Sequence, residues 1–483
     1  MSQINLLGYE TRVSEEHSVA VEVQQIADLD RQLLDRFRNR LSIEGDLTRQ
    51  IVSFQANKER PRYRWFKYKE AFSVSLVDYL LRRFSIKNGV VLDPFAGMGT
   101  TLFAVGNHGI ECHGIELLPI GQEIIESRLL LEKGLSSEEL DLIDKWSRTK
   151  PWRHSKARAT LSELRITKGA YPPETIAAIE RVLAAAQSQG QRLQRVLRFA
   201  LLCVLENVSY TRKDGQYLRW DYRSGRRQGN KPFDKGVVAG FDEAYSRKLV
   251  EIMDDIAYRG GCRELFESKM TEPHVRLMHG SCLEIMPTLG SGTYSAVITS
   301  PPYCNRYDYT RTYALELALL GIGEQELMAL RQQMLTCTVE NRAKDLMTNS
   351  AWQMAIRATD EQPLLQAILA YLDAQRIQGR LNNSGIPRMV RGYFYEMACV
   401  IAECARLLAD SGSVIMVNDN VRYAGVPISV DLILSEIARA CGLDTDAILV
   451  LPNGKGNSSQ QMGEHGREPL RKCVYVWRKS HAH

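Results

Sequence analysis

The 483-residue sequence predicts an α/β fold in which a mainly parallel sheet carries two helical insertions. The first observation is the run from Val90 to Glu116, where a strand, a glycine-rich turn, a helix and a second strand follow one another. The second is that β-branched apolar segments return only much later, at "VRLMHGSC" and "YSAVITS". The third is the pair of strand patterns near the end of the chain, "GSVIMVND" and "RKCVYVW". Strands that alternate with helices are typical of parallel sheets.

The elements are expected in the following order. The first strand covers residues 90–93, a helix covers 100–108 and the second strand covers 110–116. Segments such as "ETIAAIERVLAAAQSQ" and "EAYSRKLVEIMDDIAY" then show the period of amphipathic helices. After "YSAVITS", the segment "YFYEMACVIAECARLL" predicts a further helix before the last strands.

We expect four segments along the chain. Residues 1–50 form an N-terminal helical extension, and residues 51–119 form the first part of the α/β core. Residues 120–270 form a large helical insertion. Residues 271–483 form the second part of the core, which contains a smaller helical insertion at about residues 312–385. A length of this size fits an enlarged domain with insertions or a few separate domains.

The composition is that of an ordinary soluble globular protein, with 44% hydrophobic and 25% charged residues. A net charge of +5 permits a polyanionic partner but does not demonstrate one. None of the ten cysteines forms a C-x-x-C pair, so we expect free thiols in a reducing cytosol and no metal site. No signal-peptide pattern opens the sequence, and no apolar run approaches the roughly 20 residues of a membrane span. We therefore expect a cytoplasmic protein with no membrane partner.

The glycine-rich turn "DPFAGMGT" contains the first group of candidate site residues. Asp93 ends a strand, and Gly97 and Gly99 allow a tight bend that brings the backbone close to a ligand. A nicotinamide-binding turn is the rival interpretation, but Leu102 stands where that motif needs a third glycine. Glu116 ends the next strand, where an acid can accept both ribose hydroxyls of a nucleoside. A purely structural turn and a solvated strand-end acid are the alternatives.

The segment "SPPY" follows the strand pattern "YSAVITS" and contains the second group. Consecutive prolines stop a strand and fix a rigid bend. A site that modifies an exocyclic amine of a base needs hydrogen-bond acceptors aimed at the amine, and the Ser300 hydroxyl and the Pro301 carbonyl could supply two. Tyr303 could stack on a base that has been swung out of its duplex. The alternative is a structural turn after a core strand.

"DPFAGMGT" with "SPPY" downstream resembles the amino-methylating DNA methyltransferases that use S-adenosyl-L-methionine. The resemblance implies a class I Rossmann-like methyltransferase fold with a seven-stranded, mainly parallel sheet, a double-stranded DNA substrate and base flipping. It also implies roles for matching residues. The cofactor turn would comprise Asp93, Pro94, Phe95, Gly97, Gly99 and Thr100, the ribose acid would be Glu116, and the catalytic motif would be Ser300, Pro301, Pro302 and Tyr303.

Two further segments resemble parts of the same family. "YKEAFSVSLVDYLL" matches the segment that packs beside the methionine end of the cofactor, which implies contacts from Phe72 and Ser73. The alternative for Ser73 is that it caps the amphipathic helix that follows it. "HGSC" falls where the family has the strand near the adenine, which implies contacts from Ser281 and Cys282. A polar strand end is the alternative there.

A basic and aromatic segment, residues 210–235, is expected to contact DNA. Cations suit phosphates and aromatic rings suit unstacked bases, although a solvated basic loop is the alternative. The residues expected to bind DNA are Arg212, Lys213, Arg219, Trp220, Arg223, Arg226 and Arg227. They lie in the 120–270 insertion, which is the candidate target-recognition region. The C-terminal segment "NGKGNSSQQMGEHGREPLRK" is a second candidate.

The family implies a reaction but leaves the base open. Serine before Pro-Pro-Tyr usually accompanies cytosine-N4 methylation, whereas Asp or Asn more often accompanies adenine-N6 methylation. The sequence thus predicts a cytosine-N4 DNA methyltransferase, with adenine-N6 methylation as the first alternative and guanine-N2 methylation of RNA as a further one. Cytosine-C5 methylation requires a Pro-Cys nucleophile, and the sequence has no Pro-Cys.

A catalytically inactive specificity subunit is the alternative from another class. Such a subunit would show erosion of the two motifs, but both are intact in this sequence. A cognate restriction endonuclease or other defence-system proteins are expected as partners by family analogy alone.

Overall fold

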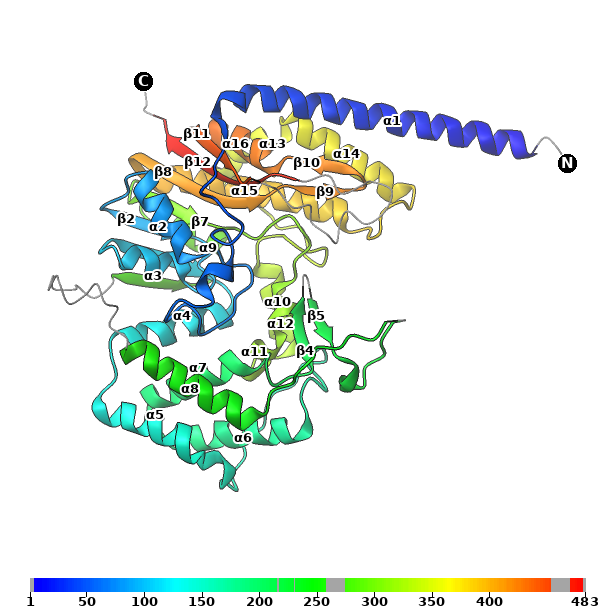
Figure 1. Cartoon of the computed structure of the whole chain (residues 1–483). Helices are drawn as coiled ribbons and strands as arrows, with labels where there is room; N and C mark the ends of the chain where they lie inside the picture. Colours follow the sequence, from blue (N-terminus) through cyan, green and yellow to red (C-terminus); the bar gives the residue numbers. More distant parts are fainter. Residues whose placement is uncertain (1–3, 215–216, 230, 258–273, 453–469, 481–483) are drawn as a thin grey trace. The chain divides into compact units, whose positions relative to one another are not determined.

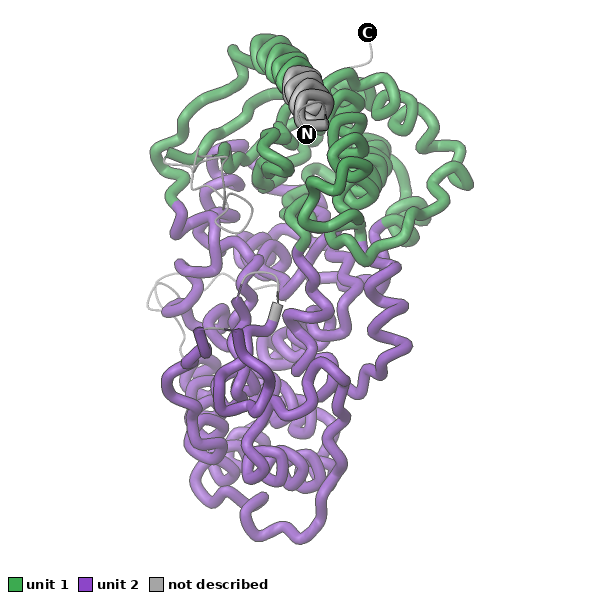
Figure 2. Tube along the Cα trace, turned by 90° about the vertical axis from the view of Figure 1, so that its right-hand side faces the viewer, with its two compact units in different colours: residues 1–48, 283–306, 335–483 green, residues 49–282, 307–334 purple. Residues whose placement is uncertain are grey.

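The computed structural model describes residues 4–214, 217–229, 231–257, 274–452 and 470–480. The chain forms two compact units, each built from segments that are far apart in the sequence (Figure 2). Unit 1 comprises residues 1–48, 283–306 and 335–483, and unit 2 comprises residues 49–282 and 307–334. The division into four segments made from the sequence stays a prediction.

The main sheet has eight strands in the order β1-β11-β12-β8-β7-β2-β3-β6. Five of them, β2, β7, β8, β11 and β12, are labelled in Figure 1. Eight is one strand more than the resemblance implies, because the short β1 pairs in parallel with β11 at the edge of the sheet. β12 runs antiparallel to both its neighbours, whereas the pairs β7–β8, β2–β3 and β3–β6 are parallel. The strands are β1 (Leu41–Ile43), β2 (Val90–Asp93), β3 (Glu111–Glu116), β6 (Val275–His279), β7 (Tyr294–Thr299), β8 (Leu408–Asp419), β11 (Leu443–Val450) and β12 (Lys472–Lys479).

Unit 2 contains β2, β3 and β6, and the strand, turn, helix and strand predicted between residues 90 and 116 are confirmed. Helix α3 (Thr100–Gly106) follows the glycine-rich turn, and α4 (Pro119–Glu132) follows β3. Pro119 stands in the first turn of α4, where its missing N–H costs no helical hydrogen bond. Helix α2 (Val74–Arg83) begins after Ser73 and buries an apolar face.

Most of the described residues between β3 and β6 are helical, as the sequence predicts. The helices are α5 (Ser137–Thr149), α6 (Pro173–Gln187), α7 (Gln191–Val204) and α8 (Phe241–Ala257), and they pack on one another (Figure 1). The ring of Tyr245 in α8 meets the ring of Trp152 edge-on, with 5.1 Å between their centroids. The same part of the chain also contains irregular segments and an antiparallel hairpin of β4 (Thr211–Asp214) and β5 (Tyr217–Trp220). Helices α10 (Tyr309–Thr312), α11 (Ala314–Leu319) and α12 (Glu324–Gln333) also belong to unit 2.

Unit 1 contains the other five strands of the main sheet and a set of long helices. Helix α15 is apolar along most of its length and contacts β8, α13, α14 and α16, while α1 contacts α14 and α16 (Figure 1). Residues 4–37 of the predicted N-terminal extension are helical, and the same extension supplies β1. The remaining elements are α1 (Ile4–Phe37), α13 (Gln353–Asp360), α14 (Pro363–Ile377), α15 (Ile386–Leu407), α16 (Val430–Ala440), β9 (Val421–Tyr423) and β10 (Val426–Ile428), with the short α9 (Cys282–Ile285) at a unit boundary.

No helix in the described part of the chain is both long enough and apolar enough to cross a membrane. The cysteines that the structure describes are free thiols, and eight of the nine are buried. Cys262 lies outside the described residues.

Candidate functional site

The turn after β2 requires glycine at Gly97 and most strictly at Gly99. Gly97 and Gly99 have φ angles of +57° and +79°, in the left-handed region that side chains disfavour. A Cβ atom on Gly99 would lie 2.9 Å from both Ile125 and Phe103, so the close packing of the turn also excludes a side chain. Asp93 is 2% exposed, and its Oδ1 accepts a hydrogen bond of 3.1 Å from the backbone N–H of Phe95. The strand end and the turn therefore form one fixed unit.

Glu116 at the end of β3 is bonded to this turn. Its Oε2 accepts a hydrogen bond of 2.6 Å from the N–H of Gly97, and its Oε1 accepts one of 2.7 Å from the N–H of Leu118. Burial raises the pKa of Glu116 to about 7, although both amide hydrogen bonds favour the ionised form. The carboxyl group thus sits beside the glycine turn, as the resemblance implies for a ribose acceptor.

Gly121 is a residue of this region that the sequence reasoning did not identify. A Cβ atom there would lie 2.4 Å from the carbonyl oxygen of Gly97 and 2.7 Å from Cγ of Glu116. Only glycine lets the first turns of α4 approach the glycine turn this closely. A glycine inside a helical pattern, in "PIGQE", was the available signal.

The other predicted cofactor residues of unit 2 lie in varied surroundings. Phe72 is buried, and Ser73 does cap α2, because its Oγ accepts a hydrogen bond from the N–H of Leu76. The Ser281 hydroxyl donates to the carbonyl of Gln333, and Cys282 is buried. The Oγ1 atom of Thr100 is buried and has no hydrogen-bond partner among the residues described. Pro94 is buried and Phe95 half-buried. Their contacts with a cofactor stay predictions.

A stacked pair of aromatic rings, Tyr68 and Tyr313, lies next to Gly97 of the same turn. The ring of Tyr68 would lie 3.5 Å from a Cβ atom on Gly97, and it stacks on Tyr313 with 4.8 Å between centroids and 9° between planes. The Tyr313 hydroxyl donates a hydrogen bond of 2.5 Å to Glu70, and burial raises the pKa of Glu70. Neither Tyr68 nor Tyr313 was identified from the sequence, because a pair of aromatic residues this far apart has no local pattern.

The proline corner belongs to unit 1 and follows β7. The hydroxyl of Ser300 donates a hydrogen bond of 3.1 Å to the hydroxyl oxygen of Tyr303. Pro301 is buried, whereas Pro302 and Tyr303 are half-buried. The hydroxyl of Tyr423 donates a hydrogen bond of 2.8 Å to the carbonyl of Cys304, which fixes the backbone directly after the corner. The four residues of the motif are thus held in one rigid turn.

Lys472 and Asp419 lie beside the corner and were not identified from the sequence. The Nζ atom of Lys472 is 5.6 Å from the centroid of the Tyr303 ring and 3.2 Å from Oδ1 of Asp419. Burial raises the pKa of the Tyr303 phenol, whereas the charge of Lys472 and a hydrogen bond from it work in the opposite direction. Charged residues are common at strand ends, so nothing in the sequence distinguishes Lys472 from the other charged residues at such places.

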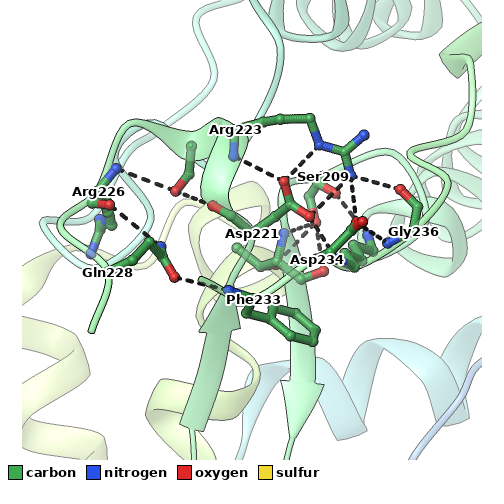
Figure 3. A network of polar contacts seen from close by, with 11 residues as sticks. Ser209, Asp221, Arg223, Arg226, Gln228, Phe233, Asp234 and Gly236 are labelled. Carbon is green, nitrogen blue, oxygen red and sulfur yellow. Dashed lines mark hydrogen bonds and ion pairs between the residues drawn. The ribbon is translucent and has the colours of Figure 1, made fainter. Parts of the chain in front are cut away.

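Within residues 210–235, three of the predicted DNA-binding cations hold the fold of unit 2. Lys213 is 2% exposed and lies 2.5 Å from a carboxylate oxygen of Glu316. The guanidinium of Arg223 binds Asp221 and the carbonyl of Gly236 (Figure 3).

Arg226 is the third of these cations. It donates to the carbonyls of residues 165, 166 and 168 and lies 3.5 Å above the Trp220 ring. These contacts lie within the protein, and a contact of the three cations with DNA stays a prediction.

Like Arg223, the other predicted cations are exposed. Arg212 and Arg219 are direct partners across the β4–β5 hairpin, and both side chains are exposed. Arg219 also forms an ion pair of 3.2 Å with Asp214 and lies 4.0 Å above the Phe233 ring. Arg227 is exposed as well. The second DNA-binding segment predicted from the sequence, near the C-terminus, falls mainly on residues 453–469, outside the described residues.

Comparison with known proteins gives a consistent result. The family model for N6/N4-type DNA methylase matches residues 35–127. The chain is 55% identical to type II methyltransferase M.AvaI of Nostoc sp. over 95% of this chain and 94% of that protein. It is 39% identical to type II methyltransferase M.BsoBI of Geobacillus stearothermophilus over 89% and 88%. A solved structure from Galdieria sulphuraria, described as a sarcosine dimethylglycine methyltransferase, covers 84% of this chain at 10% identity, and its TM-score of 0.27 is too low to support a conclusion.

Proposed function

Because this chain belongs to the type II DNA methyltransferases of the N4/N6 amino-methylating family, we propose that it methylates the exocyclic N4 of cytosine within a short DNA sequence. The observation that carries the choice of cytosine is Ser300, directly before Pro301, Pro302 and Tyr303. Serine at this place usually accompanies cytosine-N4 methylation in the family that the sequence resembles. The family itself includes adenine-N6 enzymes, so the base is the part of the proposal that needs a test.

The proposed methyl donor is S-adenosyl-L-methionine, which supplies a methyl group on a positively charged sulfur. Its proposed binding residues fit such a molecule. Gly97 and Gly99 keep the turn free of side chains, and Gly121 keeps α4 close behind it. We propose that Glu116 accepts hydrogen bonds from the ribose hydroxyls, as a strand-end acid does for other nucleoside cofactors.

The proline corner would bind the target base. We propose that Tyr303 stacks on a cytosine that has been rotated out of the duplex. The Ser300 hydroxyl donates to Tyr303, which leaves lone pairs on the serine oxygen to accept an N–H of the amine. The Pro301 carbonyl would accept the second N–H. In the proposed transfer, the amine lone pair would form the new N–C bond as the C–S bond of the sulfonium breaks, leaving S-adenosylhomocysteine. The proton released from the nitrogen would pass to solvent water.

For DNA binding, we propose a narrower set of cations than the sequence predicts. Arg212 and Arg219 face each other across the hairpin, and like charges in directly opposite positions destabilise a strand pair. A phosphate between them would relieve that repulsion. Arg227 would add a third contact. Lys213, Arg223 and Arg226 would act indirectly, by holding the hairpin and the loop after it in shape.

Type II DNA methyltransferases act on DNA and belong to restriction–modification systems. We propose that the chain methylates the sites of a cognate endonuclease, in the cytoplasm where that DNA lies.

The test is methyl transfer to mixed-sequence DNA, followed by digestion to nucleosides and mass spectrometry. N4-methyldeoxycytidine is the expected product. N6-methyldeoxyadenosine would contradict the choice of base but not the family. Absence of any methylated deoxynucleoside, together with absence of a rise in melting temperature on adding S-adenosylmethionine, would indicate an inactive specificity subunit.

A further inference from the structure

A lysine from a distant strand lies beside the tyrosine of the proline corner. Lys472 is the first residue of β12, and its Nζ atom is 5.6 Å from the centroid of the Tyr303 ring. Both residues belong to unit 1. This distance is within the range of a cation–π interaction. The reaction proposed above gives Lys472 no role.

The position of the Lys472 ammonium is itself fixed. Lys472 pairs with Asp419 in the register of β12 and β8, and the two side chains form an ion pair of 3.2 Å. The side chains of Lys472 and Asp419 are 26% and 27% exposed, so the pair is partly shielded from solvent. The two strands run antiparallel over seven paired positions, which makes the base of the lysine side chain rigid.

The Lys472 ammonium is suited to donate a hydrogen bond to the Tyr303 hydroxyl. An ammonium group only donates hydrogen bonds, and a phenol oxygen can accept more than one. Tyr303 receives the hydroxyl of Ser300 at 3.1 Å. The Lys472 ammonium, 5.6 Å from the ring centroid, is placed to donate to the same phenol oxygen. A phenol whose oxygen is held by two donors keeps its ring in place, so the ring loses little freedom when a base stacks on it.

We propose that Lys472 is a positioning residue. It holds the Tyr303 ring in a fixed position relative to the Ser300 hydroxyl before the target base binds. Asp419 in turn holds Lys472. The inference rests on the proposed function, because it assigns Tyr303 to base stacking and Ser300 to the amine. Alignment of the acceptor with the amine is a matter of fractions of an ångström, and a displacement of about 1 Å can cost about 100-fold in rate.

The same lysine could instead bind a DNA phosphate, and the two roles give different measurements. A phosphate contact acts on DNA affinity and on its dependence on salt, whatever residue stands at position 303. A positioning role acts through Tyr303, so its effect vanishes once the hydroxyl of Tyr303 is absent. A double-mutant cycle separates the two.

The experiment compares single-turnover methyl transfer by wild type, Lys472→Met, Tyr303→Phe and the double variant. Methionine keeps the length of the side chain and removes the charge. We expect Lys472→Met to lower the rate about 30-fold in the wild-type background and less than about threefold in the Tyr303→Phe background. Lys472→Arg should recover most of the rate. The matched control is Lys479→Met, on the same strand, whose ammonium donates to the carbonyl of Leu408.

The outcomes are distinct. If Lys472→Met lowered the rate by the same factor in the two backgrounds, the inference would be overturned. It would also be overturned if Lys472→Met mainly weakened DNA binding and made that binding less dependent on salt. Folding of each variant is checked by its dissociation constant for S-adenosylmethionine, which should stay at the wild-type value. Failure of the proposed function shows differently, since wild type itself would then transfer no methyl group or would transfer it to adenine.

Discussion

Lys213 and Glu316 form an ion pair of 2.5 Å in which the side chains are only 2% and 1% exposed. The ammonium also lies 4.5 Å from the centroid of the Tyr313 ring and 4.8 Å from that of Phe66. Lys213 comes from β4 and Glu316 from α11, so the pair fastens the hairpin to the helix within unit 2. Burial raises the pKa of Glu316, and the charge of Lys213 opposes this.

Lys213→Met should destabilise unit 2, because it leaves the Glu316 carboxylate buried without its cation. Loss of one partner of a buried pair costs about 3–5 kcal/mol. The double variant Lys213→Met/Glu316→Leu should regain most of this, because it leaves no buried charge. Denaturant unfolding followed by tryptophan fluorescence measures both. Arg212→Met, one residue earlier and exposed, is the control and should change stability by less than about 0.5 kcal/mol.

The role of Lys213 shows where reasoning from the sequence stops. The elements between residues 90 and 116 were predictable, because adjacent residues determine a strand, a glycine turn and a helix start. The partner of Lys213 lies 103 positions further along the chain, and a strand of four residues is too short for its alternation to be recognised. Lys213 therefore looked like one cation of a basic loop. Lys472 and Asp419 are another pair that only the register of two strands brings together.

Arg212→Ala and Arg219→Ala should each weaken DNA binding without changing the fold of the hairpin. If each guanidinium neutralises one phosphate, the slope of log K against log salt should fall by about 0.9 for each substitution. Fluorescence anisotropy of labelled duplex DNA at several salt concentrations gives this slope. The matched control is Arg148→Ala on α5, an arginine that is 76% exposed. Unchanged slopes for both hairpin variants would remove the hairpin from the DNA interface.

Cofactor affinity should rise with pH, with a midpoint set by Glu116. The raised pKa of about 7 means that the buried carboxyl holds its proton below that pH. Ribose hydroxyls donate to the ionised form more strongly, so binding is coupled to loss of the proton and weakens as pH falls through 7. A change of about tenfold is expected between pH 5.5 and 8.5, measured by calorimetry with S-adenosylmethionine. Glu116→Gln should bind weakly at every pH in this range, and a pH dependence that survives the substitution would exclude Glu116 as its source.

Tyr303→Ala and Asp93→Ala should give opposite kinetic results, because the two residues are proposed to serve different ligands. Tyr303→Ala removes the ring that would stack on the base, and stacking on an aromatic side chain is worth about 1–3 kcal/mol. Turnover with DNA should therefore fall by about 5- to 150-fold, while the dissociation constant for S-adenosylmethionine stays near the wild-type value.

Asp93→Ala should instead raise the dissociation constant for the cofactor. Asp93 accepts a hydrogen bond from the N–H of Phe95, so its loss frees the start of the glycine turn. At saturating cofactor, part of the turnover should return in Asp93→Ala, but none in Tyr303→Ala. Calorimetry with S-adenosylmethionine and initial rates at several cofactor concentrations make the comparison. If the two variants lost cofactor affinity equally, the proline corner would have to contribute to cofactor binding, and the role of Tyr303 as a base-stacking ring would be wrong.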